Sequence, residues 1–299
     1  MLWAVFTVIA AGAQVIRNAM QRDLTATLGT FGATQVRFLF GFPFGLIMLA
    51  FALVAMNEPL PALSTRYLLW TFGGGAFQIA ATALMLKAMS SRSFVVTTAY
   101  TKTEPVQVAL FGLIFLGDSL SAGLTLAILV ATSGVMLLGW PQKLAGAAAK
   151  ATGNFGPALL GLAAGASFAL SAILFRGAIH TLDGSVSTWV RASTTLAFGL
   201  GMQTSVLLAY LLIADRKTLR AIGRAWKPSM LAGFMGAAAS QFWFLGFALT
   251  SAARVRTLAL VEVLFAYAIS GRIFKERLAA REIVGLCLVV IGVGLSLNT

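Results

Sequence analysis

The feature that most constrains this sequence is its succession of long apolar runs, each about 18–25 residues and bounded by short polar stretches. A helix of about 20 residues spans the roughly 30 Å hydrocarbon core of a bilayer. Hydrophobic residues make up 59% of the chain and charged residues 10%, against about 25% charged in soluble domains. A single soluble core has no room for so much apolar surface. We therefore expect an all-α integral membrane protein.

The composition of the runs favours helices over a transmembrane β-barrel. Barrel strands alternate lipid-facing and interior residues over about ten positions, whereas these runs are continuous stretches rich in Leu, Ala, Gly, Phe and Val. We predict ten transmembrane helices, near residues 1–20, 31–55, 66–89, 94–116, 121–140, 157–179, 186–213, 228–250, 253–273 and 280–298.

The two halves of the chain resemble each other. The stretch PQKLAGAAAKATGNFG at 141–156 is small, polar and flexible, as expected of a linker. A constant offset of 158 positions carries charged and glycine positions of the first half onto the second: Glu104 onto Glu262, Asp118 onto Glu276, and Gly134 onto Gly292. The sequence thus predicts a five-helix repeat over residues 1–142, a linker over 143–156, and a second five-helix repeat over 157–299.

Five helices per repeat, an odd number, place the two halves in opposite orientations across the membrane. Inverted repeats of this kind are typical of transporters that bind substrate near the bilayer midplane. Lys and Arg are abundant at 214–227 and 271–282 but nearly absent at 56–65 and 117–120. By the positive-inside rule both termini are predicted to be periplasmic in a bacterial inner membrane. This assignment places Arg17 on the cytoplasmic side and Arg256 on the opposite side.

Charge and rare residues exclude several other classes. The net charge of +13 fits basic loops that meet anionic lipid, and no basic stripe interleaved with aromatics indicates nucleic-acid binding. Cys287 and His180 are single residues of their types, so neither an intramolecular disulfide nor a metal site is expected. No cofactor is expected, and the partners expected are a small-molecule substrate and lipid, with a monomer plausible. A membrane enzyme, a receptor and a structural role remain weaker alternatives.

Two matching segments resemble the drug/metabolite transporter superfamily. They read KAMSSRSFVVTTAYTKTEPVQVALFGLIFLGDSL and FALTSAARVRTLALVEVLFAYAISGRIFKERL. The pattern is similar to ten-helix exporters built from two EamA-type repeats, most of all to the proteobacterial aromatic amino acid exporters. The resemblance implies export of small molecules and no enzymatic activity. Val263 stands where the family usually has Pro, so we expect a straighter helix there than at Pro105.

Ionisable residues at membrane depth are the first candidates for a site, because charge is costly there. Tyr100, Glu104 and Gln107 share one helix face, and Pro105 removes a backbone hydrogen bond beside them. Such a kinked helix suits substrate or ion binding. A purely structural tether to a neighbouring helix is the alternative, and both interpretations apply equally to Glu262.

Polar and aromatic residues on other helices complete the predicted lining. Amides and hydroxyls there would contact a zwitterion, while aromatic rings meet an apolar side chain. The predicted residues are Gln14, Asn18, Gln78, Thr82, Ser167, Gln241, Trp243 and Phe244. Interhelical hydrogen bonding and packing are the structural alternatives.

Three further cations receive separate predictions. Lys102, on the far face from Glu104, is expected to pair with a carboxylate on another helix rather than line the cavity rim. Arg37 and Arg191 match across the repeat, and snorkelling to the interface is their expected role. Binding of a substrate carboxylate is the alternative for both.

These predictions favour a secondary exporter of amino acids, chiefly aromatic and apolar ones, and related metabolites. Transport would proceed by rocking of the two inverted repeats around a central site. Proton-coupled and facilitated flux fit equally well. The alternative substrates are cationic drugs and sugar-like metabolites.

Overall fold

The computed structural model describes residues 1–91, 100–138, 156–265 and 280–298. Every regular element in these ranges is an α-helix. In chain order they are α1 (Leu2–Leu39), α2 (Gly41–Met56), α3 (Thr65–Ser91), α5 (Glu104–Leu116), α6 (Ala122–Leu138), α7 (Gly156–Thr181), α8 (Thr188–Ala214), α9 (Arg216–Arg224), α10 (Trp226–Leu249), α11 (Ala252–Leu258) and α13 (Ala280–Leu297).

Helices α1 and α2 together form an apolar stretch of 55 residues that must fold back on itself. A straight helix of that length would measure about 80 Å, more than twice the bilayer core. The reversal is at Gly29, whose φ of 66° and ψ of 178° lie outside the helical region. The Gln21 side-chain amide then donates to the Ala33 carbonyl across the reversal at 2.9 Å. The first predicted helix, over 1–20, therefore ended too early. The second predicted helix, over 31–55, corresponds to the last part of α1 together with the whole of α2.

Five other predicted helices agree closely with α3, α7, α8, α10 and α13, each of which is long and apolar enough to cross a membrane. Helices α5 and α6 are apolar but shorter. The predicted helices over 94–116 and 253–273 lie partly outside the described residues. The structure thus supports a multi-pass membrane protein, while the count of ten remains a prediction.

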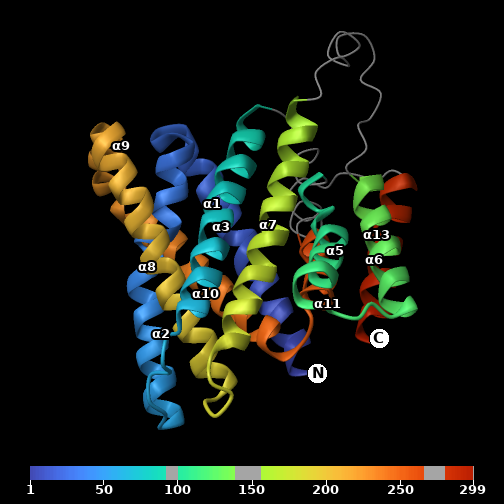
Figure 1. Cartoon of the computed structure of the whole chain (residues 1–299). Helices are drawn as coiled ribbons and strands as arrows, with labels where there is room; N and C mark the ends of the chain where they lie inside the picture. Colours follow the sequence, from blue (N-terminus) through green and yellow to red (C-terminus); the bar gives the residue numbers. More distant parts are fainter. Residues whose placement is uncertain (92–99, 139–155, 266–279, 299) are drawn as a thin grey trace, which may run out of the picture.

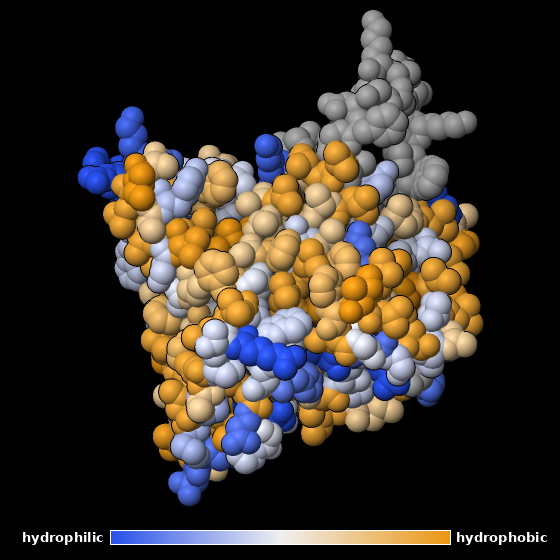
Figure 2. Space-filling model, viewed as in Figure 1, coloured by the Kyte–Doolittle hydropathy of each residue, from blue (hydrophilic) through white to orange (hydrophobic). Residues whose placement is uncertain are grey.

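The outer surface is apolar in the manner of a lipid-facing bundle. Large side chains stand exposed on several helices, among them Phe51 at 70%, Val54 at 81% and Ile213 at 87%. Figure 2 shows hydrophobic residues over the middle of one face, with hydrophilic residues toward its two ends. Soluble monomers rarely expose contiguous apolar patches of this extent. Lipid is the solvent that such a surface requires.

The contact between α6 and α13 shows how the two halves are related. A Cβ on Gly134 of α6 would lie 2.7 Å from the Gly285 carbonyl oxygen and 2.8 Å from the Val289 nitrogen of α13. Gly292 of α13 approaches Ala131 and Ala127 of α6 equally closely. With the offset of 158 positions, these six residues form three repeat-matched pairs: Gly134 with Gly292, Ala131 with Val289, and Ala127 with Gly285. Exchange of the halves therefore reproduces the interface. The backbones meet without intervening side chains, as in small-residue packing between membrane helices.

Other helix pairs follow the same exchange. Helix α1 packs along α10, and α3 packs along α7. In each pair, one helix belongs to each half of the chain. The halves are therefore interleaved rather than placed side by side.

The ends of the bundle differ in charge. Figure 1 shows the two chain termini at one end and α9 at the other, while the connection from α2 to α3 lies away from α9. Helix α9, RKTLRAIGR, carries four basic residues. Its N-cap residue Asp215 accepts from the Thr218 hydroxyl at 2.6 Å and backbone at 3.1 Å, and these bonds lower the Asp215 pKa. By the positive-inside rule, the α9 end is predicted to be cytoplasmic.

The close backbone approach predicts the effect of adding one methyl group. Gly292→Ala places Cβ 2.5 Å from the Ala131 nitrogen, and we expect a loss of about 1–3 kcal/mol of stability from overpacking. Gly294→Ala, on the same helix, meets nothing within 4 Å and should be neutral or slightly stabilising. Thermal unfolding of both variants in nanodiscs compares them. Equal stability of the two variants would contradict the packing described.

Because the α2–α3 connection and α9 lie at opposite ends of the bundle, cysteines placed in them should react with a reagent from opposite sides of the membrane. In a Cys287→Ser background, Leu60→Cys should react with an impermeant maleimide added outside the cell, and Lys217→Cys only after the membrane is opened. Reaction of both cysteines from the same side would refute the inverted arrangement.

Candidate functional site

Two helices are interrupted at repeat-matched positions. In the first half, a turn at 102–103 precedes α5, which begins at Glu104. In the second half, α11 ends at Leu258 and a turn at 259–260 precedes a helical segment that contains Glu262. Pro105 occupies the first turn of α5, where its missing N–H costs little. The prediction of a straighter helix at Val263 is wrong, because the second helix is interrupted without any proline.

Buried ion pairs join these interruptions across the two halves. Lys102 of the first half pairs with Glu262 of the second, which confirms the predicted pairing of Lys102. Arg256 of the second half has its Nε 3.0 Å from Oε1 of Glu104 in the first. All four side chains are less than 10% exposed. Arg256 was counted among the charges on the non-cytoplasmic side, and its burial between the halves corrects that assignment.

The reciprocal arrangement has an energetic reason. An ionised side chain at the centre of a bilayer costs about 2.5–3.5 kcal/mol on insertion scales. Pairing each carboxylate with a cation from the other half offsets that cost only while the halves are together. Glu104 and Glu262 thus have the contacts of tethers between the halves. A role in binding substrate or ions is a proposal.

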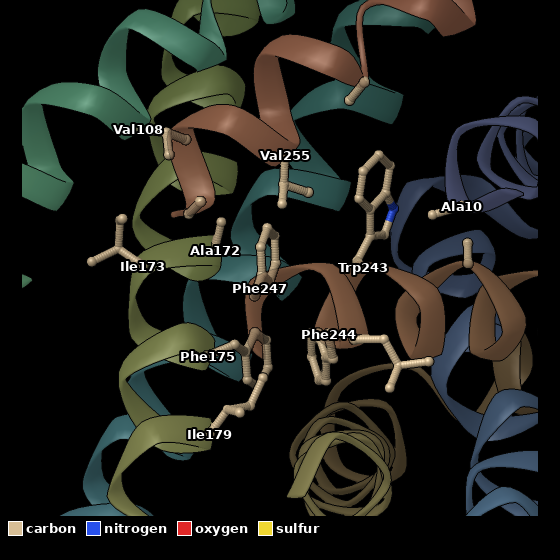
Figure 3. Close-up of a cluster of buried hydrophobic side chains, with 14 of the residues drawn as sticks. Ala10, Val108, Ala172, Ile173, Phe175, Ile179, Trp243, Phe244, Phe247 and Val255 are labelled. Atoms are coloured by element: carbon tan, nitrogen blue, oxygen red, sulfur yellow. The ribbon is translucent and has the colours of Figure 1, made fainter. Parts of the chain in front are cut away.

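Amide and indole groups extend the Glu262 pair toward α10. The Gln14 side-chain nitrogen donates to Oε2 of Glu262 at 2.8 Å, and its oxygen accepts from the Trp243 indole at 3.1 Å. In Figure 3 the indole nitrogen of Trp243 points toward the helix that carries Ala10. The Arg256 guanidinium lies 4.6 Å from the Trp243 ring centroid, within cation–π range. The two ion pairs are therefore linked through Gln14 and Trp243.

A second polar group lies between α3 and α8. The Gln203 amide donates to the Gln78 side-chain oxygen at 2.7 Å and to the Gly75 carbonyl at 3.2 Å. Gln78, Gln203 and Phe244 line one narrow gap that has no room for a water molecule. The rings of Phe244 and Phe175 pack against each other at a tilt of 42°, with centroids 4.7 Å apart (Figure 3). Gln78 and Phe244 thus line the same gap, and their predicted role in binding substrate stays a prediction.

The remaining predicted residues lie in mixed surroundings. Thr82 accepts from Arg37 at 3.0 Å, and Gln241 donates to the Ser193 hydroxyl at 3.0 Å. Asn18, Tyr100 and Ser167 are half-buried. The Asn18 side-chain oxygen accepts hydrogen bonds from its neighbour Arg17. Among the described residues, none of these three has a hydrogen bond to a member of the two ion pairs.

Two buried arginines were assigned wrongly from sequence. Arg17 is 1% exposed and Arg37 is 2% exposed, although Arg17 was predicted on the cytoplasmic side of the membrane and Arg37 at the interface. Helix α1 continues past Arg17, and α10 packs on both residues: a Cβ on Gly236 would lie 3.5 Å from Cδ of Arg17 and 3.1 Å from Cγ of Arg37. The spacing of Gln14, Arg17 and Gln21 at i, i+3 and i+7 was the available signal.

A polar cavity lies at the N-terminal end of α11. A cavity of about 320 Å³ is lined by residues of the α5–α6 turn, α7 and the α10–α11 turn, including Asp118, Arg176 and Arg254. Arg176 Nη1 contacts both Asp118 carboxylate oxygens, at 2.7 and 2.9 Å. Arg254 belongs to α11, two residues before the buried Arg256. The cavity therefore lies at the N-terminal end of α11, the helix that carries Arg256.

Comparison with known proteins identifies the family. The sequence profile of the EamA-like transporter family matches residues 1–140 and 156–298. The chain belongs to this family. EamA-like proteins are membrane transporters of small molecules in the drug/metabolite transporter superfamily.

Solved structures support the same fold. One crystal structure of a protein superposes with a TM-score of 0.68 and covers 99% of this chain and 95% of its own, at 15% sequence identity. At that identity the likeness concerns the fold alone. No curated protein sequence matches this EamA-like chain.

The ion pairs predict strong coupling between their members. Lys102→Met and Glu262→Gln should each cost about 3 kcal/mol or more, because each leaves a buried charge unpaired. The double variant should cost much less than the sum. The free energies of unfolding of the unaltered protein, both single variants and the double variant, measured in mixed micelles, give the coupling energy. The exposed pair Arg22–Asp23, 3.3 Å apart, is the control and should couple by less than about 1 kcal/mol. Additive losses at Lys102 and Glu262 would contradict the buried pair.

Proposed function

We propose that this protein is a secondary transporter that exports amino acids, chiefly aromatic and apolar ones, and related small metabolites. We propose further that it works by alternating access of two inverted repeats, residues 1–142 and 157–299. The observation that carries the proposal is the buried chain of polar contacts between the halves, centred on two interrupted helices. Membership of a small-molecule transporter family supports it.

The polar contacts suit a ligand that replaces them. An amino acid carries one carboxylate and one ammonium, so it can take the place of a carboxylate and a cation without leaving either partner unpaired. Lys102 and Glu262 each offer such a partner. When contacts with the ligand replace contacts between the halves, separating the halves costs less free energy. The ligand thereby promotes the movement that carries it.

The apolar part of the ligand has partners close by. Trp243 and Phe244 are buried on α10, beside Gln14 and Gln78 respectively. Aromatic faces next to amides suit a molecule with a polar head and an apolar body. Cationic drugs fit poorly, because both buried glutamates already face cations. Sugar-like metabolites would leave the charged groups without a ligand partner.

Location and assembly follow from the same proposal. We place the protein in the bacterial inner membrane with both termini periplasmic, supported by the basic helix α9 at the opposite end from the termini. One chain carries both repeats, so a monomer holds a complete pathway.

The test is uptake of labelled phenylalanine by proteoliposomes, with and without a pH gradient. Saturable flux is expected, and the gradient separates proton-coupled from facilitated transport. Trp243→Phe removes the indole donor to Gln14 and should lower flux about tenfold. Trp226→Phe makes the same change at a residue 50% exposed on the same helix and should leave flux unchanged. Folded protein without saturable flux of any amino acid would refute the proposed substrate class.

A further inference from the structure

Buried cations outnumber buried carboxylates in the described residues. The buried charged side chains are the carboxylates Glu104 and Glu262 and the cations Arg17, Arg37, Lys102 and Arg256. Each glutamate has its own partner, Arg256 or Lys102. Within the described residues, Arg17 and Arg37 are therefore the charges in excess.

The contacts of these two arginines involve neutral acceptors. Arg17 donates to the Asn18 side-chain oxygen at 2.7 and 3.2 Å. Arg37 donates to the hydroxyls of Thr82 at 3.0 Å and Ser240 at 3.5 Å. Nη1 of Arg17 and Nε of Arg37 are buried without a hydrogen-bond partner among the described residues. A buried guanidinium N–H without an acceptor is costly, and a carboxylate is the acceptor whose shape it matches.

Both arginines lie against the layer that the ion pairs form. A Cβ built on Gly236 of α10 would lie within 4 Å of both the Arg17 and the Arg37 side chain, so the two side chains lie close to one another. The charge of Glu262 attracts Arg17, while Arg17 and Arg256 both repel Arg37. Arg17 also lies one helical turn from Gln14, the residue that bonds Glu262. An anion bound here would offset the repulsion between the cations and accept hydrogen bonds from the unpaired N–H groups of Arg17 and Arg37.

We infer that Arg17 and Arg37 form an anion subsite for the substrate carboxylate, and that the transporter prefers substrates of net negative charge to zwitterions. N-acyl amino acids and dicarboxylic acids are the chemical class that fits. A zwitterion satisfies the Lys102–Glu262 pair but brings no net charge to offset the two arginines. The subsite's place on the transport path rests on the proposed function.

Three ligands with one aromatic body and different charges test the inference on the unaltered protein. They are N-acetylphenylalanine (anion), phenylalanine (zwitterion) and phenylalanine methyl ester (cation), titrated calorimetrically into nanodiscs in chloride-free buffer. The anion should bind at least about tenfold more tightly than the zwitterion, through charge-assisted hydrogen bonds. The cation should bind most weakly.

Variants assign the preference to the arginines. Arg17→Gln and Arg37→Gln should each reduce the preference for the anion by about tenfold, whereas Arg17→Lys should retain part of it. The matched control, Arg220→Gln, removes an exposed charge from α9 and should change nothing. A preference that survives both Gln variants in folded protein would overturn the assignment.

The outcomes separate this inference from the proposed function. Equal binding of anion and zwitterion refutes the inference and leaves amino acid transport standing. Arginine-dependent binding of the anion, with no binding or flux of phenylalanine, upholds the subsite and refutes the amino acid assignment. Arginine-dependent stabilisation by chloride alone, as strong as that by N-acetylphenylalanine, would identify an inorganic anion site and refute the substrate class.

Discussion

The two reciprocal ion pairs are the constraint on which the rest of this structure depends. Each joins a cation of one half to a glutamate of the other at the point where a helix is interrupted. In a bilayer, neither half can expose its charges to lipid without a large cost. The halves must therefore stay together around this layer or open it only toward water. That restriction is what an alternating-access transporter requires.

The scaffold and the polar layer are held by different forces. Glycines bring the backbones of α6 and α13 into direct contact, and such packing depends on shape alone. The polar layer depends on hydrogen bonds and charge, which a ligand or water can replace. The fixed contact and the replaceable contacts lie in different parts of the bundle. A fixed scaffold beside replaceable contacts permits movement without unfolding.

The sequence predicted the parts of the site that follow from local patterns. Apolar runs fixed most membrane helices, and a repeat-matched glutamate within an apolar run identified Glu104 and Glu262. The sequence did not reveal that Arg17 and Arg37 are buried in the bundle. The positive-inside rule assigns charges to loops, and nothing local showed that α1 runs on to a reversal at Gly29. The partners Gln203 and Ser193 were missed because only tertiary packing of α8 brings them to Gln78 and Gln241.

The most direct test of alternating access is a pair of spin-label distances, one at each end of the bundle and each joining the two halves. Leu60 and Asp183 serve at the end with the termini, and Asp23 and Arg220 at the α9 end, in a Cys287→Ser background. Addition of a transported substrate should shift the two distance distributions in opposite directions, one lengthening as the other shortens. Distributions that stay unchanged, or that shift in the same direction, would contradict movement of two inverted halves about a central polar layer.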